Sequence, residues 1–227
     1  MCGRAAQGEF SEIEKRFHLK PGGPPAGFRA HWNAAPRMDL LTIRYDAAVG
    51  GRVAGLTRWG LVPGWATDAK VGDRAVNARA EGVEEKPTFR SAWRASRRCI
   101  IPLVAFYEWK RAAGGKQPFA FGMPDETVFG VAGLWETWRD IVSFTIITTT
   151  ANGTVGQVHD RMPVIVGADD YDAWLHGSAA RAKPLLVPWA GDLKVWAVSR
   201  LLNKSGEMDG PECLSPCPAD APINLTR

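Results

Sequence analysis

The sequence predicts an α+β fold: one domain over residues 1–227, in which short helices pack outside a curved or barrel-like, mostly antiparallel sheet. Two observations lead to this prediction. Many short stretches rich in β-branched and aromatic residues are bounded by Gly- and Pro-containing turns, whereas few stretches have helical periodicity. A chain of 227 residues with 45% hydrophobic and 23% charged residues can also bury one substantial core.

The predicted helices are short and amphipathic. They cover residues 9–19, 89–98 and 169–175. In the first, Phe10, Ile13 and Phe17 share one face, and Ser11 is placed to cap the N-terminus. Asp169 is placed to cap the third.

Strands are predicted where apolar and β-branched residues run between turn signals. The predicted strands are residues 40–45, 53–59, 99–110, 117–122, 127–132, 143–150, 162–166 and 193–198. A Gly-Gly turn separates the first two, and Pro102 interrupts the third. From about residue 205 the composition of Pro, Cys and acidic residues predicts a weakly ordered tail.

Charge and hydropathy limit the class of protein. The chain has 28 Lys and Arg against 24 Asp and Glu, and a net charge of +4 does not by itself establish a polyanionic partner. No apolar run is long enough to span a bilayer and no signal peptide is recognisable, so we expect a cytoplasmic protein without a membrane partner. Clustered arginines are equally compatible with phosphate binding and with a solvated helix face: Arg74, Arg79, Arg90, Arg94, Arg97 and Arg98.

The four cysteines do not predict a disulfide or a metal site. A reducing cytosol argues against disulfides. Cys213 and Cys217 have the spacing of half a zinc site, but no second Cys or His pair lies near them in sequence. We therefore predict no metal and no cofactor. Cys99 lies in an apolar run and is predicted to be a core thiol.

Cys2 is the most informative residue of the chain. Removal of Met1, which is efficient before a small residue, would leave an α-amine beside the Cys2 thiol. The amine titrates near ~8 and the thiol near ~8.5, so both have a nucleophilic fraction at neutral pH. Such a 1,2-aminothiol can attack an amide or ester, or condense with an aldehyde and close to a thiazolidine ring. The alternative is an ordinary residue near the start of a chain.

Three further polar residues are candidates for chemistry. Glu108 lies between Tyr107 and Trp109, and burial there would raise its pKa and make it a general acid or base. The alternative is a strand residue on the solvent face. His159 lies in a polar loop, where a lone histidine is commonly a surface residue. Asn77 can donate a hydrogen bond to an oxygen that gains charge, or simply hold a turn.

Seven ordered motifs together are similar to those of one known family. They are Met1-Cys2-Gly3-Arg4, Trp59-Gly-Leu-Val-Pro63, Asn77-Ala-Arg-Ala-Glu81, Arg98-Cys-Ile-Ile-Pro102, Phe106-Tyr-Glu-Trp109, Gly133-Leu-Trp-Glu136 and His159-Asp-Arg-Met-Pro163. The chain resembles the SOS-response-associated peptidase (SRAP) family, also called the abasic-site-processing proteins. The resemblance covers residues 2 to about 216, and so many ordered motifs make it highly specific.

The resemblance implies a sensor of abasic sites in single-stranded DNA, strand junctions included. Cys2 would condense with the aldehyde of the ring-opened abasic sugar, and the resulting thiazolidine cross-link would shield the lesion in the DNA damage response. Glu108 would move protons during imine formation, ring closure and reversal. His159 would protonate the ring oxygen of the deoxyribose, and Asn77 would hold the sugar and Cys2 in position.

The resemblance also implies DNA contacts and shows departures from the family pattern. Arg4, Arg79 and Arg161 resemble the family's phosphate contacts, and Trp65 resembles an aromatic wedge at strand junctions. This chain has Ala5 where an aromatic is common and Ala66 where a bulky residue is common, which predicts a weaker wedge.

The same residues are compatible with alternative functions. A lyase side activity could follow from β-elimination through the imine. An N-terminal-cysteine peptidase could use Cys2 against a peptide bond, for example in an autoproteolytic step. A non-covalent single-stranded DNA-binding module would lose affinity with salt and would not need Cys2. We expect a monomer in each case.

Overall fold

The computed structural model of the chain describes residues 2–112, 115–204 and 206–218. The strands are β1 (Ala5–Gln7), β2 (His31–Ala34), β3 (Asp39–Asp46), β4 (Gly51–Trp59), β5 (Asn77–Arg79), β6 (Arg98–Leu103), β7 (Ala105–Ala112), β8 (Gly115–Gly122), β9 (Phe129–Trp138), β10 (Ile141–Thr150), β11 (Arg161–Pro163), β12 (Ile165–Val166) and β13 (Lys194–Ala197). The α-helices are α1 (Phe10–Phe17), α2 (Arg90–Arg94), α3 (Tyr171–Leu175) and α4 (Ala179–Ala182). The 3₁₀ helices are η1 (Ala69–Arg74), η2 (Val155–Gln157), η3 (Ala168–Asp170), η4 (Lys183–Leu185), η5 (Arg200–Asn203) and η6 (Pro211–Leu214).

In the described part of the chain the strands form two sheets. One has the order β13-β8-β7-β1-β2. The other has the order β11-β10-β4-β3-β6-β9-β12, and β10 also pairs with β9, so this sheet closes into a ring. Most pairings are antiparallel, but β10 runs parallel to β4 and β5. The predicted α+β class with a curved, mostly antiparallel sheet is confirmed.

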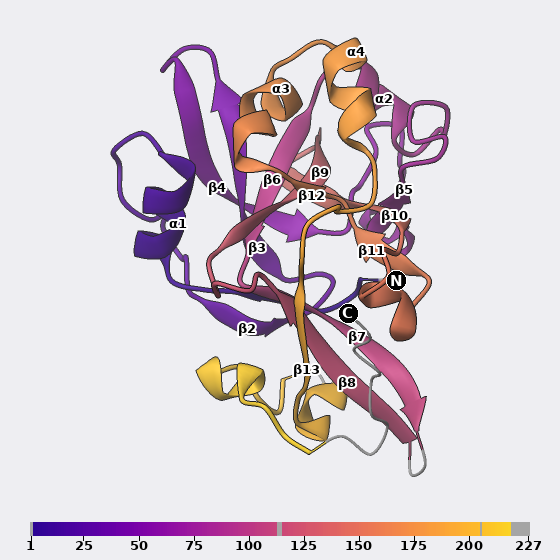
Figure 1. Cartoon of the computed structure of the whole chain (residues 1–227). Helices are drawn as coiled ribbons and strands as arrows, with labels where there is room; N and C mark the ends of the chain where they lie inside the picture. Colours follow the sequence, from indigo (N-terminus) through magenta and orange to yellow (C-terminus); the bar gives the residue numbers. More distant parts are fainter. Residues whose placement is uncertain (1, 113–114, 205, 219–227) are drawn as a thin grey trace.

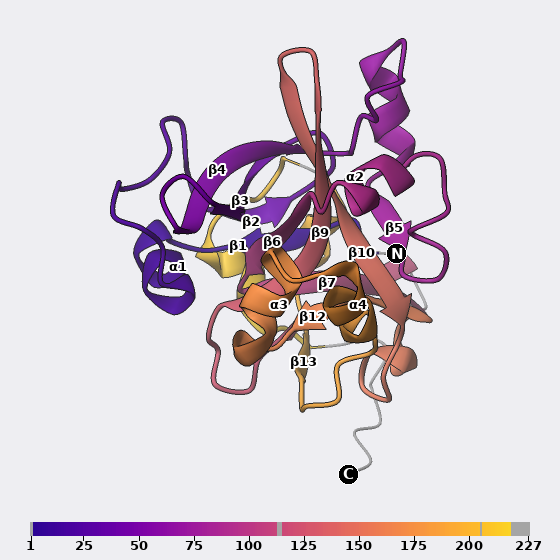
Figure 2. The same cartoon turned by 90° about the horizontal axis from the view of Figure 1, so that it is seen from above.

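The short helices lie outside the sheets (Figures 1 and 2). Helix α1 buries Ile13 and Phe17 on the face that the sequence predicted, and Phe17 stacks on Tyr171 of α3 with ring centroids 4.9 Å apart. Helix α2 lies beside β5, while α3 and α4 cover one end of the ring (Figure 1). None of the helices in the described ranges is long and apolar enough to cross a membrane.

Several predicted helix ends are wrong. Ser11 does not cap α1, because the helix starts at Phe10 and its N-cap residue, Glu9, makes no side-chain cap hydrogen bond. Asp169 lies inside η3 and does not cap α3. The helix predicted over residues 89–98 ends at Arg94, since Ser96 adopts a positive φ of 53° and β6 then begins at Arg98.

The strand predicted over residues 99–110 is two strands that belong to different sheets. Strand β6 joins the ring and β7 joins the other sheet, with Val104 between them. Pro102 lies within β6 opposite Gly130. The sequence missed β1, β2 and β5, because these three short strands lack β-branched residues and their pairing partners lie far along the chain.

The C-terminal segment, defined here as residues 199–204 and 206–217, packs below the sheet that contains β7 (Figure 1). It carries η5 and η6, and Cys213 is fully buried in a cluster with Ala6, Tyr107 and Leu202. Of the tail predicted from about residue 205, Ser205 and residues 219–227 lie outside the described residues.

Candidate active site around Cys2

Strand β1 places Cys2 at the junction of the two sheets. Ala5 of β1 pairs with Phe106 of β7, and the N–H of Tyr107 donates to the carbonyl of Arg4 at 3.0 Å. Cys2 precedes this strand and is fully buried, with its Sγ 3.9 Å from the carbonyl of Arg4. Burial, together with the charge of Glu108, raises the pKa of the Cys2 thiol far above its usual range. The thiol is therefore protonated at neutral pH until a base removes its proton.

Asn77 of β5 contacts Cys2 directly. Its Nδ2 donates to the main-chain carbonyl of Cys2 at 2.8 Å. Strand β5 is held beside β10 by parallel pairing, in which Asn77 lies opposite Ile146. The Asn77 Oδ1 is buried and accepts no hydrogen bond from the described residues. A buried acceptor of this kind is available to a hydroxyl or amine of a substrate.

Glu108 of β7 is buried, so the solvent-face alternative is wrong. Its exposed fraction is 2%, although alternating neighbours in β7 face the other side of the sheet. Burial, with a smaller contribution from the charge of Asp160, raises the pKa of Glu108 to about 7. A carboxyl with this pKa exchanges protons efficiently at neutral pH, as a general acid or base must.

His159 faces Glu108 from the loop between η2 and β11. Its Nε2 lies 4.0 Å from Glu108 Oε2, and its Nδ1 accepts a hydrogen bond from the N–H of Arg161 at 3.0 Å. Burial lowers the pKa of His159, which favours the neutral ring. These contacts assign the proton to Nε2, facing Glu108. Asp160 Oδ1, 3.0 Å from Nδ1, can accept a proton only from the charged ring, and its carboxylate is largely exposed and screened.

The residues predicted to contact DNA divide into two groups. Arg79 and Trp65 are exposed, and the Trp65 indole, 59% exposed, donates to the carbonyl of Pro87 at 3.2 Å. Arg161 is buried and forms a bidentate pair with Glu81 at 2.7 and 2.9 Å. Arg4 is half-buried and donates to protein acceptors of β2 and η5.

The loop after Trp65 is supported by the β9–β10 hairpin. Ala66 is buried, and its carbonyl accepts a hydrogen bond from the Trp138 indole at 2.6 Å. The N–H of Val62 donates to Ser143 Oγ of β10 at 2.8 Å. The exposed Trp65 ring is thus mounted on a loop that is anchored on both sides.

A cationic cavity of about 570 Å³ reaches Asn77 from the side of α2 and η1. Three of its lining residues are cationic, namely Lys70, Arg74 and Lys86. Sequence reasoning noted Arg74 but missed the two lysines, because they belong to no motif and only the fold brings them to Asn77. Positive groups beside a buried nucleophile favour an anionic substrate.

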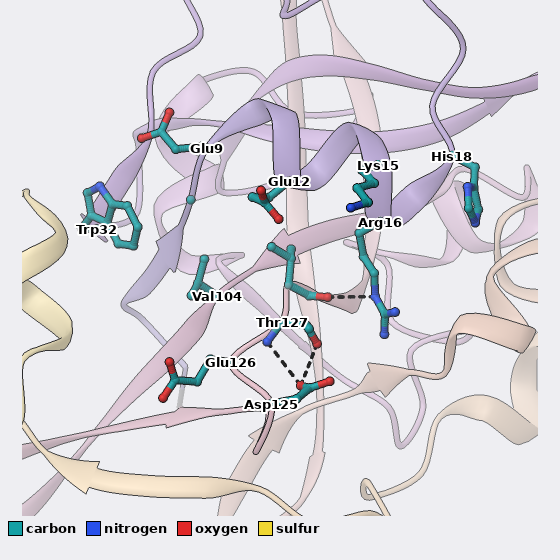
Figure 3. A pocket seen from close by; sticks show the side chains of 12 residues that line it. Glu9, Glu12, Lys15, Arg16, His18, Trp32, Val104, Asp125, Glu126 and Thr127 are labelled. Atoms are coloured by element: carbon teal, nitrogen blue, oxygen red, sulfur yellow. Dashed lines mark hydrogen bonds between the residues drawn. The ribbon is translucent and has the colours of Figure 1, made fainter.

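A larger cavity, of about 650 Å³, lies elsewhere, between α1 and the loop of residues 123–128 (Figure 3). It contains none of the predicted site residues. Two of its charged groups already have partners in the protein: Arg16 Nε donates to the carbonyl of Val128 at 3.2 Å, and Asp125 accepts from Thr127 (Figure 3). Cavity size alone therefore does not locate the chemistry, whereas the Cys2 site combines a nucleophile with groups of shifted pKa.

The described residues hold no group of three or more His, Cys, Asp or Glu side chains arranged for a metal ion. Cys99 and Cys213 are buried free thiols. Burial raises the pKa of Cys99, as expected for a core thiol.

Comparisons with known proteins define the family. Residues 1–205 match the family model "SOS response associated peptidase (SRAP)". The chain is 37% identical over 225 residues to "Abasic site processing protein YoqW" of Bacillus subtilis (strain 168), covering 94% of this chain and 99% of that protein. It is also 29% identical over 231 residues to "Abasic site processing protein HMCES" of Gallus gallus, covering 86% of this chain and 68% of that protein. The chain belongs to the SRAP family.

Two solved structures share the fold. A crystal structure of a Bacteroides thetaiotaomicron protein superposes with a TM-score of 0.83 at 22% identity, covering 95% of this chain and all of that one. A crystal structure of a Bordetella bronchiseptica protein superposes with a TM-score of 0.77 at 29% identity, covering 87% of this chain and all of that one.

Proposed function

We propose that this protein processes abasic sites in single-stranded DNA by capturing them covalently through Cys2 once Met1 has been removed. One observation carries the proposal: the four residues expected to act together come from four separate segments and lie together around the buried Cys2 and Glu108. Asn77 bonds to the carbonyl of Cys2 at 2.8 Å, and His159 Nε2 lies 4.0 Å from Glu108 Oε2. The charge of Glu108 also acts on the Cys2 thiol.

The residues fit condensation of an aminothiol with an aldehyde. The Cys2 amine adds to the aldehyde carbon, and the carbinolamine loses one water to give an imine. The Cys2 sulfur then adds to the imine carbon, a C–S bond forms, and the thiol proton ends on the ring nitrogen. The net change is the loss of one water, with no oxidation or reduction. The raised pKa of Glu108, about 7, lets it give a proton to the departing hydroxyl and accept the thiol proton.

His159 suits the step that precedes condensation. An abasic deoxyribose is closed for most of the time, and opening to the aldehyde requires a proton at the ring oxygen. His159 can supply it from its charged form, in which Nδ1–H faces Asp160 and Nε2–H faces the same space as Glu108; loss of the Nε2 proton then leaves a neutral ring. The unpartnered Oδ1 of Asn77 can accept from a sugar hydroxyl and hold the lesion near Cys2.

The surroundings suit a nucleic acid strand. The cationic cavity beside Asn77 would neutralise phosphates, and the exposed ring of Trp65 would stack on a base or at a strand junction. Arg79 is exposed at the end of β5, the strand that carries Asn77. Single-stranded DNA that carries an abasic site is the substrate that joins these features to the aminothiol. The SRAP relatives that are described as abasic site processing proteins support this assignment.

The decisive experiment uses a labelled single-stranded oligonucleotide with one abasic site and no added borohydride. We expect a shifted band on a denaturing gel that is absent with Cys2→Ala and with undamaged DNA. Intact mass should show a mature chain that starts at Cys2. With Met1 shown to be removed, no shifted band would reject covalent capture. Strand cleavage without an adduct would favour a lyase, and peptide cleavage without DNA would favour the peptidase of the family's description.

A further inference from the structure

Asp209 connects the C-terminal segment to strand β2. Its Oδ1 accepts hydrogen bonds from the N–H groups of Trp32 and Asn33 at 2.7 and 2.8 Å. Its Oδ2 lies 3.0 Å from Nδ1 of His31. Strand β2 is the edge of its sheet, and Asp209 supplies the acceptor for two of its main-chain donors. Asp209 lies beyond residue 205, where the match to the family model ends.

Asn33 forms hydrogen bonds both with the C-terminal segment and with Arg4. Its Nδ2 donates to the carbonyl of Met208 at 3.0 Å, and its Oδ1 accepts from Arg4 Nη1 at 2.6 Å. The same Arg4 nitrogen donates to the carbonyl of Leu202 at 2.9 Å. Two acceptors, one on β2 and one on the C-terminal segment, therefore fix the guanidinium of Arg4.

The main chain of Arg4 lies directly against the nucleophile. The Arg4 carbonyl accepts the N–H of Tyr107 at 3.0 Å and lies 3.9 Å from Cys2 Sγ. Fixing Arg4 therefore fixes the acceptor toward which the thiol points.

Strand β7 is braced from the same face of the sheet. The hydroxyl of Tyr107 donates to the carbonyl of Trp32 at 2.7 Å, and Trp109 Nε1 donates to Asn203 Oδ1 at 2.6 Å. Because side chains alternate along a strand, Glu108 projects from the opposite face. The C-terminal segment thus holds β7 from behind while leaving Glu108 on the side of Cys2.

We propose that the C-terminal segment, acting through Asp209, Asn33 and Arg4, positions the Cys2 thiol for reaction. Arg4 then serves as a positioning residue, and its Nη1 is committed to protein acceptors instead of a DNA phosphate. The proposal rests on the proposed capture chemistry for its biological meaning. Its physical content, the orientation of the Cys2 aminothiol, can be measured without DNA.

The test compares Asp209→Ala, Arg4→Ala and the double variant in the full-length mature protein. The first readout is the rate constant of adduct formation at saturating abasic-site DNA. The Kd for undamaged DNA is measured together with it. The second readout is the rate constant for 2-cyanobenzothiazole, a small probe that reacts with N-terminal cysteine. We expect Asp209→Ala to slow both reactions by about tenfold, with Kd changed by less than about twofold. The double variant should be no slower than Arg4→Ala, because Asp209 acts through Arg4 and its loss has no further effect once Arg4 is removed.

Controls separate positioning from simple loss of folding. A smaller folded fraction lowers the amplitude of adduct formation and leaves its rate constant unchanged, whereas unfolded chains, in which the buried Cys2 is exposed, react with the probe in a separate, faster phase. Asp209→Asn keeps an oxygen acceptor for the two main-chain donors and should retain most of the rate. Glu207→Ala removes an exposed pair with Lys204, 2.9 Å long, in the same segment, and should behave as wild type.

Three results would overturn the proposal. The first is a wild-type rate constant for both reactions in Asp209→Ala. The second is additive losses in the double variant. The third is an Arg4→Ala protein with normal probe reactivity, weaker DNA binding and a shallower salt dependence, which would make Arg4 a phosphate contact. If wild-type protein forms no DNA adduct but Asp209→Ala still slows the probe, the capture function fails while the positioning role stands.

Discussion

The amide of Asn77 donates to the main-chain carbonyl of Cys2 at 2.8 Å, which ties β5 of the ring to the residue that precedes β1 of the other sheet. This bond leaves the Asn77 Oδ1 buried and without an acceptor role in the described structure. One side chain therefore holds the nucleophile with its donor and offers its acceptor to a substrate. A carboxylate in place of the amide would lose the donor to Cys2, because an ionised carboxylate only accepts hydrogen bonds.

Asn77→Asp should slow adduct formation. The carboxylate would face the Cys2 carbonyl oxygen, and repulsion would replace the hydrogen bond. We expect the rate constant to fall by about tenfold or more, since displacement of a reacting group by a fraction of an ångström carries losses of this size. Single-turnover gels with abasic-site DNA measure it. Thr88→Ala, in the same cavity but without a bond to Cys2, is the matched control; equal losses in both variants would contradict a specific role for Asn77.

The pKa of Glu108, raised by burial to about 7, predicts how adduct formation depends on pH. If ionised Glu108 accepts the thiol proton, the rate of ring closure rises with pH through about 7 and levels off above it. Glu108→Gln cannot titrate and should remove this inflection while slowing the reaction by about 10² to 10⁴. Rate profiles from pH 5.5 to 8.5 on both proteins test this. An inflection that persists in Glu108→Gln would assign it to another group.

The raised pKa of Glu108 also predicts how the stability of the fold depends on pH. Stability should fall as pH rises, whereas the rate of adduct formation should rise. A carboxyl with a folded pKa of about 7 and an unfolded pKa near ~4.3 favours folding most at low pH, where both states are protonated. The contribution is lost as pH rises through about 7. Glu108→Gln should therefore unfold at a higher temperature than wild type at pH 8, with a free-energy gain on the order of 3 kcal/mol, and the difference should shrink toward pH 4. Thermal melts across this range decide it.

The cationic cavity predicts salt-dependent affinity for DNA. Lys70→Ala combined with Lys86→Ala should weaken binding to an undamaged single strand and reduce the slope of log K against log salt by about 0.7 for each lysine that meets a phosphate. Lys15→Ala is the control. It removes one positive charge, as each cavity substitution does, but it lies in the remote cavity of Figure 3. Equal effects of the cavity and control lysines would show only a general charge effect.

The fold class was predictable from the pattern of short strands and turns, and motifs mark the four candidate residues that the fold brings together. Glu108 stands out as a carboxylate between aromatic residues, but which face of the strand it takes was open in the sequence, and the fold decides its burial. The contacts of Arg161 were not predictable, since its partner Glu81 is 80 residues away and the pairing depends on how β10 lies beside β11. Short strands such as β1 and β5 were missed for the same reason: their structure comes from neighbours and not from local propensity.

Arg161 and Glu81 give a final prediction that separates a structural arginine from a DNA contact. The hydrogen bond from Arg161 lowers the pKa of Glu81, so the pair stabilises the fold above the unfolded pKa near ~4.3 and loses this contribution as pH falls further. Glu81→Gln should lower Tm at pH 7, and the difference from wild type should shrink as pH falls below ~4.3. Because the Glu81 side chain is 56% exposed and its charge is screened by solvent, we expect the loss of stability to be about 1 kcal/mol or less. If Arg161 instead serves a phosphate, freeing it by Glu81→Gln should tighten DNA binding.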